Sequence, residues 1–343
     1  MVRNNLLHTE NAEQVVAQLQ AQINDSAAQN KQKESAMFSW NLEQLCESTD
    51  GDIIGPRSES VNFTSISTDT RTLQPGALYI AIKGERFDGH AFIDQAIQQG
   101  AVAVLVSAEV DSIIPGVQVK DTRIALGEFA RWHRQQMPVK TLIAITGSNG
   151  KTTTKSLLTN IFAKVGITLA TEGNLNNDFG VPRTLLNLRP EHEFAIIEMG
   201  ANHPHEIGYL TALALPDIAM INNASGAHLE GFGSLQGVIE TKGEIFDGLN
   251  RIAGKKAGTA VINTDSPGYT DWLKRLKALE VNNIVRFGTD ADAQVRVTDF
   301  KVADASAIAF TLNISYEQAP AVAYQVEMPV LGFHNAMNAA ACT

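Results

Sequence analysis

Cysteine is scarce in this chain of 343 residues, and long apolar runs are missing. Cys46 and Cys342 lie far apart without metal-binding or redox spacing, which indicates a reducing compartment. No apolar stretch approaches the roughly 18–20 residues that cross a bilayer, and the N-terminus lacks the pattern of a secretory signal. Basic residues number 27 against 37 acidic ones, which argues against nucleic acid as a partner. We therefore expect a cytoplasmic protein with no membrane span.

The composition that remains is typical of a globular protein, with 44% hydrophobic and 19% charged residues. The length predicts about two domains. Residues 1–36 are rich in Gln, Asn, Ala and Ser with a thin apolar stripe, so we expect a mobile N-terminal extension, with a docked helix as the alternative. The pattern over 37–137 predicts a small mixed α/β domain, with strands at 77–82 and 101–107 and helices at 90–99 and 123–136.

Beyond Pro138, short apolar runs alternate with amphipathic helices. This alternation predicts an α/β central domain over 138–343, with a mostly parallel sheet covered by helices. We expect a strand-rich segment at 284–330 and a helix that begins near Asn335. The predicted parallel strands are 142–146, 194–198, 217–222 and 259–263.

The segment 141–153, TLIAITGSNGKTT, predicts a phosphate-binding loop (P-loop) between a strand and a helix. We expect Lys151 on an exposed loop, where it can reach the β- and γ-phosphates of ATP, and the Thr152 hydroxyl can ligate Mg²⁺. Ile145 stands where the usual motif has its first glycine, so an ordinary glycine-rich turn is the alternative. The predicted nucleotide-binding residues are Gly147, Ser148, Asn149, Gly150, Lys151, Thr152 and Thr153.

Three further side chains are candidates for metal or phosphate binding. Glu198 ends an apolar strand, at the edge where Mg²⁺ needs an oxygen ligand, although such a carboxylate can also cap a helix. His228 follows the next strand and could reach a metal, although a lone loop histidine is more often solvated. Lys242 lies in a charged helical patch, which by itself indicates a surface lysine.

Amide side chains gather in two places. The loop at 172–182 is dense in amides that suit a polar, peptide-like substrate, although Asn and Gly also form turns. A second pair lies three residues apart on one predicted helical face, where it could meet an adenine edge. The candidates are Asn174, Asn176 and Asn177 in the loop, and Asn335 and Asn338 on the helix.

Together these motifs resemble the Mur ligase family. The resemblance rests on TGSNGKTT, EGNLNNDFGVP, IIEMGANHPHEIGYL, AHLEGFGS, KGEIF and GFHNAMNAAA, and on SISTDTRTLQPGALYIAIKGERFDGHAFI, which resembles a UDP-sugar-binding domain. Within the family, EGNLNNDFGVP and IIEMGANHPHEIGYL resemble the member that adds a dipeptide. The resemblance implies an ATP-dependent ligase that joins D-alanyl-D-alanine to UDP-MurNAc-tripeptide, through an acyl phosphate, in peptidoglycan precursor synthesis.

The resemblance also implies roles for individual residues. Lys151, Lys242 and His228 would be catalytic, Thr152 and Glu198 would hold one Mg²⁺, and His228 would hold a second with a carbamylated Lys242. Asn335 and Asn338 would face the adenine. The tripeptide would meet Asn174, Asn176 and Asn177, and the UDP end would lie near Thr68, Asp69, Thr70 and Arg71.

Two alternatives stay open. Family members continue into a third domain, which this chain does not reach, so it could be a non-catalytic nucleotide-binding fragment of such a ligase. It could also be a related ligase that adds a single amino acid. We expect a monomer in either case.

Overall fold

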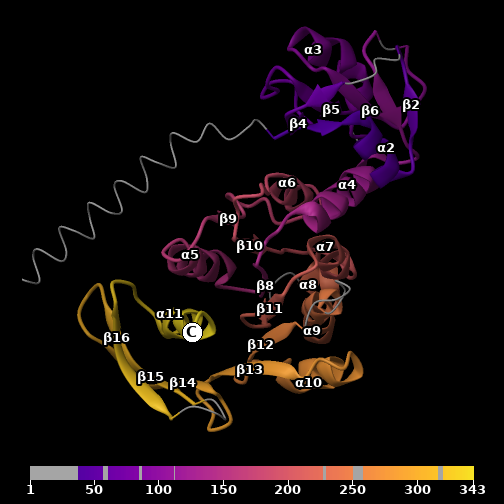
Figure 1. Ribbon diagram of the computed structural model, residues 1–343. Helices are drawn as coiled ribbons and strands as arrows, with labels where there is room; N and C mark the ends of the chain where they lie inside the picture. The colour runs from indigo at the N-terminus through magenta and orange to yellow at the C-terminus, as the bar shows by residue number, and fades with distance from the viewer. Residues whose placement is uncertain are drawn as a thin grey trace, which may run out of the picture.

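The computed structural model describes residues 38–56, 61–84, 87–111, 113–226, 229–249, 258–315 and 320–343, with backbone alone at 229 and 230 (Figure 1). The extension predicted at 1–36 lies outside these ranges and stays a prediction. In the described part of the chain, no helix combines the length and apolar character needed to cross a membrane.

A five-stranded sheet organises the first part of the described chain, drawn in indigo and violet in Figure 1. Four of its strands are parallel, and β2 is an antiparallel edge strand. Every side chain of the central strands β5 and β6 is buried, as expected where both faces are covered. The elements are β1 (Trp40–Asn41), α2 (Leu42–Thr49), β2 (Asp52–Ile54), β3 (Asn62–Phe63), β4 (Ser65–Ser67), β5 (Ala77–Ile80), η1 (Gly89–Phe92), α3 (Ile93–Gln98), β6 (Ala103–Val106), β7 (Gly116–Gln118) and α4 (Thr122–Gln136).

A nine-stranded sheet forms the rest of the fold, in the order β16-β15-β14-β13-β12-β11-β8-β10-β9. Strands from β14 to β9 pair in parallel, whereas β15 and β16 extend the sheet with antiparallel pairs. The predicted α/β class is confirmed. The strands are β8 (Thr141–Thr146), β9 (Thr168–Ala170), β10 (Phe194–Glu198), β11 (Ile218–Ile221), β12 (Thr259–Asn263), β13 (Asn283–Gly288), β14 (Val295–Val302), β15 (Ile308–Ile314) and β16 (Val322–Met328).

Helices cover both faces of this sheet, because successive strand side chains enter different cores. Leu142 and Ala144 of β8 pack in the core shared with α4, α6, α7, α9 and α10, while Ile143 and Ile145 pack with α5 and α11. Figure 1 shows α5 and α11 on one side of the central strands and α7, α9 and α10 on the other. The helices are α5 (Lys151–Phe162), α6 (Gly180–Leu186), α7 (Glu206–Ala214), α8 (Leu229–Phe232), α9 (Leu235–Gly243), η2 (Glu244–Gly248), α10 (Tyr269–Ala278) and α11 (Phe333–Ala341).

Helix α4 connects the two sheets through a shared core. One continuous apolar cluster runs from Trp40 through Phe129 of α4 to Leu188 and the strands of the large sheet. Within it, His133 accepts a hydrogen bond from the Trp40 indole N–H at 3.0 Å, and its other ring nitrogen lies 3.0 Å from the Leu188 carbonyl oxygen. The division into domains at residue 138 stays a prediction.

Candidate active site

The predicted phosphate loop joins β8 to α5 at the carboxyl edge of the large sheet (Figure 1). Gly150 directly precedes α5 with φ of +80°, a conformation that favours glycine. A Cβ atom there would lie 2.4 Å from Oδ1 of Asn338. Hydrogen bonding within the helix begins with the Thr154 N–H, which donates to the Gly150 carbonyl at 2.9 Å. The amides of residues 151–153 therefore lack intrahelical acceptors, and such helix starts bind anions.

The loop after β11 supports the phosphate loop. The Ser148 N–H donates to the Asn223 carbonyl and the Asn149 N–H donates to Asn223 Oδ1, both at 3.0 Å. The Ser225 N–H donates in return to Ser148 Oγ at 2.9 Å. These two loop amides are thus paired within the protein, and the first-turn amides of α5 are among the donors that remain.

Lys151 lies partly buried as the first residue of α5, so the expectation that it lies on an exposed loop is wrong. The left-handed Gly150 turns the chain directly into the helix. Lys151 Nζ donates to the Gly147 carbonyl at 2.7 Å. Burial lowers the pKa of Lys151, and the charge of Glu198 opposes this shift.

Glu198 is the buried last residue of β10, with 2% of its surface exposed. Its Oε2 accepts a hydrogen bond from the Thr152 hydroxyl at 3.1 Å, and its Oε1 accepts one from the Asn176 amide at 2.9 Å. The structure thus brings together the strand end, the start of α5 and the amide loop. A carboxylate and a hydroxyl are oxygen donors of the kind that Mg²⁺ prefers.

Lys242 is buried near the end of α9, with 6% of its surface exposed. Interpreting its sequence pattern as that of a surface lysine is therefore wrong, because α9 packs against α7 and α10. Burial lowers the pKa of Lys242 to about 8, and the positive charge of Lys151 lowers it further in the same direction. Burial and the like charge both favour the neutral amine.

His228 lies outside the described residues, so its expected place beside Lys242 stays a prediction. Within the part that the structure describes, no three His, Cys, Asp or Glu side chains gather closely enough to hold a metal ion by themselves. Any metal bound here would therefore depend on other oxygen donors, such as the Thr152 hydroxyl, or on groups outside the described residues.

Asn335 and Asn338 share one face of α11, as predicted. Asn338 is buried beside Gly150, and its amide donates to Asn335 Oδ1 at 3.3 Å. Asn335 is half-buried and donates to the Leu331 carbonyl at 2.8 Å. The pair therefore lies next to Gly150 of the phosphate loop. Its contact with adenine stays a prediction.

The amide loop divides into different local roles. Asn176 binds Glu198, whereas Asn177 Oδ1 accepts the Gly180 N–H at 2.9 Å at the start of α6. Asn174 is exposed. Only Asn176 of the three hydrogen-bonds a residue of the predicted metal site in the described structure.

Two buried polar residues beside the phosphate loop were not predicted. Lys155 Nζ lies 3.3 Å from Glu198 Oε2 and donates to the Gly173 carbonyl at 3.2 Å. Lys155 follows Lys151 by four residues, which places both on one face of a helix. This spacing could have predicted that Lys155 also lies at the site. Asn222 donates to Thr154 Oγ1 at 2.8 Å, but its buried Oδ1 has no hydrogen-bond partner in the part of the chain that the structure describes.

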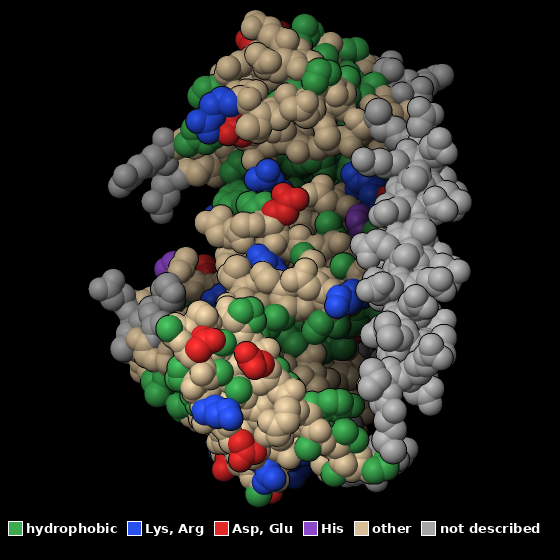
Figure 2. Space-filling view, turned by 90° about the vertical axis from the view of Figure 1, so that its left-hand side faces the viewer, with side chains coloured by type: hydrophobic (Ala, Val, Ile, Leu, Met, Phe, Trp, Pro, Cys, Tyr) green, Lys and Arg blue, Asp and Glu red, His purple; other side chains and the backbone are tan. Residues whose placement is uncertain are grey.

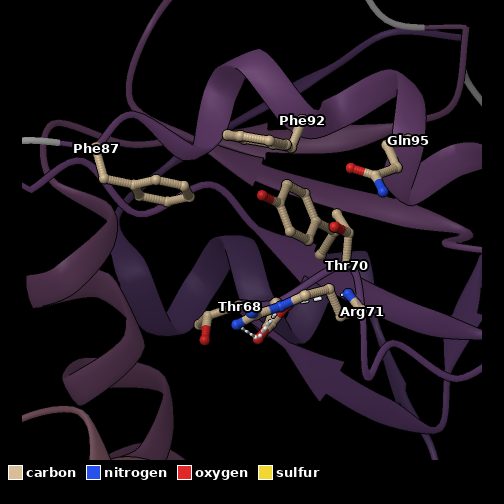
Figure 3. A pocket seen from close by; sticks show the side chains of 8 residues that line it. Thr68, Thr70, Arg71, Phe87, Phe92 and Gln95 are labelled. Atoms are coloured by element: carbon tan, nitrogen blue, oxygen red, sulfur yellow. Dashed lines mark hydrogen bonds and ion pairs between the residues drawn. The ribbon is translucent and has the colours of Figure 1, made fainter.

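The predicted UDP-binding residues line a cavity of about 630 Å³ beside the small sheet (Figure 3). Arg71 donates to both carboxylate oxygens of Asp69, at 2.9 and 2.6 Å, and these bonds lower the pKa of Asp69 to about 2. Thr68, Asp69, Thr70 and Arg71 all line this cavity.

Aromatic side chains form another part of the same cavity. Phe87 and Phe92 stack with ring centroids 5.2 Å apart, and Tyr79 and Gln95 also line the space. Figure 3 shows the two Phe rings across the cavity from Thr68 and Arg71. The sequence pattern did not predict a role for these rings, which lie in the segment GERFDGHAF. Flat rings opposite an arginine suit a ligand with a planar base and an anionic group.

Comparison with known proteins places this geometry in a family. Residues 145–343 match the model of the Mur ligase middle domain, and residues 62–140 match that of the Mur ligase family catalytic domain. The chain is 44% identical over 306 residues to UDP-N-acetylmuramoyl-tripeptide–D-alanyl-D-alanine ligase of Escherichia coli (strain K12), covering 89% of this chain and 64% of that protein. It is 42% identical to the ligase of the same name from Haemophilus influenzae, covering 90% and 64%.

Solved structures agree with these sequence matches. A crystal structure of MurF from Acinetobacter baumannii matches with a TM-score of 0.79 at 34% identity, covering 89% of this chain and 64% of that one. MurF ligase from Thermotoga maritima in complex with ADP matches with a TM-score of 0.70 at 28% identity, covering 81% and 61%. This chain thus spans slightly less than two thirds of the length of these relatives. The chain belongs to the Mur ligase family.

Proposed function

We propose that this chain binds ATP and a UDP-MurNAc-tripeptide, and serves a ligase that joins D-alanyl-D-alanine to that tripeptide. The observation that carries the proposal is that Thr152, beside Lys151 at the start of α5, donates to the buried Glu198 at the end of β10. The names of the relatives from Escherichia coli and Haemophilus influenzae support the choice of substrates.

The proposed reaction replaces a poor leaving group, oxide, with a good one, phosphate. A carboxylate is a poor electrophile because its leaving group would be oxide. In the proposed first step, the terminal carboxylate of the tripeptide attacks the γ-phosphorus of ATP, which gives an acyl phosphate and ADP. The D-alanyl-D-alanine amine then attacks the acyl carbon, and phosphate leaves with the C–O electrons. Lys151 and the first-turn amides of α5 would offset charge on the transferring phosphoryl group.

Thr152 and Glu198 would hold Mg²⁺ in this site. Their fit rests on a buried carboxylate whose Oε2 already faces the Thr152 hydroxyl at 3.1 Å. Bound Mg²⁺ would offset negative charge on phosphate oxygens. Lys155 compensates the same carboxylate at 3.3 Å, so we expect its ammonium group to compete with a cation for Oε2.

Lys242 would take up CO₂ to become a carbamate. The neutral amine attacks carbon, an N–C bond forms and a proton is released, which turns a cation into a carboxylate-like ligand. A pKa of about 8 makes the neutral amine far more abundant at neutral pH than in an ordinary lysine. His228 would be the companion ligand, as the family resemblance implies.

The proposed reaction is tested by phosphate release and product analysis. The 343-residue chain and a chimera that adds the remaining third of the Escherichia coli relative receive ATP, UDP-MurNAc-tripeptide and D-alanyl-D-alanine. We expect ATP binding by both and dipeptide ligation by the chimera. ATP binding with no ligation by either would support a nucleotide-binding fragment instead. Preference for UDP-MurNAc-dipeptide and a single amino acid would support the related ligase.

The carbamate has a test independent of turnover. With ¹³C-bicarbonate, we expect a carbamate ¹³C signal in the parent chain and none in Lys242→Ala. In the chimera, Lys242→Ala should lose activity, and short carboxylates should restore part of it by occupying the vacated oxygen positions. A carbamate signal that persists in Lys242→Ala would refute the assignment.

A further inference from the structure

A second, smaller cavity of about 130 Å³ lies between the small sheet and helix α6. It is lined by Trp40, Thr64, Ser65, Ile66, Arg183, Leu186, Asn187 and Arg189. Apart from Trp40, which donates to His133, these residues have no role in the site described above. At roughly 30 Å³ per water, the volume suits a group of a few heavy atoms such as a carboxylate.

Arg189 is held rigidly at this cavity. Its Nη1 donates to the Leu186 and Leu188 carbonyls, both at 2.8 Å. Its guanidinium carbon lies 5.1 Å from the Phe38 ring centroid and 5.2 Å from that of Trp40. These contacts leave Nε and Nη2 without a hydrogen-bond acceptor among the described residues. A fixed guanidinium group whose remaining N–H donors are unused is suited to binding an oxyanion.

Ser65 adds a further donor to the lining of this cavity. Its hydroxyl is buried and has no hydrogen-bond partner among the described residues. Buried hydroxyls are almost always paired, so an unpaired one at a cavity points to a group that binds there. A hydroxyl and a guanidinium can both donate to the same carboxylate or phosphate.

Arg183 connects this cavity to the larger one. It lies on α6, is exposed and forms no ion pair with a described carboxylate. Its positive charge nevertheless contributes to lowering the pKa of Asp69, which lines the larger cavity. Residues 64–66 also lead directly along the chain into Thr68. Seen from the side in Figure 2, the surface is hollowed between the upper and lower parts, and Lys and Arg side chains lie along that hollow.

We propose that Arg183, Arg189 and Ser65 form an anion-binding subsite for a carboxylate or phosphate of the nucleotide-linked substrate. The inference rests on the proposed function for the identity of that substrate. Within the described residues neither arginine forms an ion pair with a carboxylate, and an anionic ligand would compensate their positive charges.

The test measures calorimetric affinity for UDP-MurNAc-tripeptide and for UDP, with Arg183→Ala, Arg189→Lys and Ser65→Ala. Arg189→Lys keeps the charge but loses the planar fork, and Lys164→Ala removes an exposed charge elsewhere as a control. We expect each subsite variant to weaken tripeptide-nucleotide binding about fivefold to tenfold. Unchanged UDP affinity would assign the peptide carboxylates, and an equal loss for UDP would assign the diphosphate. Ser65→Ala should keep or raise the thermal midpoint, because it removes an unpaired hydroxyl.

A second probe separates this inference from the proposed function. Glutarate, a dicarboxylate without a nucleotide, is titrated while the ¹⁵N-labelled Trp40 indole signal is followed by NMR. We expect a shift in the parent and none in Arg183→Ala. Glutarate binding without tripeptide-nucleotide binding would support the subsite and refute the proposed substrate. Tripeptide-nucleotide binding that none of the three variants changes, or that Lys164→Ala weakens equally, would overturn the subsite.

Discussion

Lys151 is the residue on which the nucleotide assignment most directly depends. Its ammonium group already donates to the Gly147 carbonyl inside the loop, so it lies where a phosphate would bind. We expect Lys151→Ala to weaken ATP binding by at least tenfold, since a charge-assisted hydrogen bond contributes about 1.5–3 kcal/mol. Calorimetry checks the affinity, and circular dichroism checks that the fold is kept. Unchanged affinity, or an equal loss in the exposed-site control Lys164→Ala, would contradict the assignment.

Lys242 should make stability depend on pH in a predictable direction. Its folded pKa of about 8 lies below its ordinary value of 10.5, so between these values the unfolded chain holds the proton more tightly. The free energy of unfolding therefore rises with pH across this window. Lys242→Met should be more stable than the parent by up to about 3 kcal/mol near pH 7, and the difference should shrink toward pH 10.5.

Urea unfolding at several pH values, in buffers depleted of CO₂, measures this difference. Lys164→Met is the matched control, because Lys164 is exposed and should show no such dependence. A constant difference between Lys242→Met and the parent across the whole range would show that Lys242 is solvated in the folded chain.

At the scale of elements, the turn from β8 into α5 depends on Gly150. Alanine there would face a left-handed backbone and a contact of 2.4 Å with Asn338 Oδ1, whereas Gly173, at φ of +52°, has open space around it. Both substitutions cost about 1–2 kcal/mol for the backbone. We expect only Gly150→Ala to disturb the loop further, with at least tenfold weaker ATP binding. Thermal unfolding and calorimetry compare the pair, and equal effects on nucleotide affinity would refute this role.

At the scale of the whole molecule, His133 bridges the two sheets through Trp40 and Leu188. Burial lowers the pKa of His133 to about 4, below its ordinary value of 6.5. The unfolded chain therefore binds the proton first as the pH falls, and stability is lost between about pH 6.5 and pH 4. We expect this loss to reach about 3 kcal/mol in the parent and to be smaller in His133→Gln.

Tryptophan fluorescence and circular dichroism follow that acid transition. Because one apolar cluster spans both sheets, we expect the two probes to report the same midpoint. Separate midpoints would show that the sheets unfold independently, and an identical acid profile in His133→Gln would remove His133 from the explanation.

Local patterns in the sequence were sufficient for the α/β class and for several site residues. Glycines around TGSNGKTT, apolar strands that end in Glu198 and the helical spacing of Asn335 and Asn338 are short-range signals. The structure places Thr152 against Glu198 and both asparagines on one face of α11. Backbone sterics and side-chain periodicity act over a few residues, so they can be interpreted without knowing the fold.

Burial and partnership were decided only by the tertiary structure. The local sequence pattern predicts that Lys242 lies on the surface. In the structure it is buried, because α9 packs against other helices. Lys155 lies beside Glu198, Arg189 lies over the Trp40 ring, and the Ser65 hydroxyl is buried without a partner among the described residues. Each arrangement depends on segments that are far apart in the sequence. Desolvation and charge interaction depend on which distant atoms surround a group, and that arrangement exists only once the sheets and helices have packed.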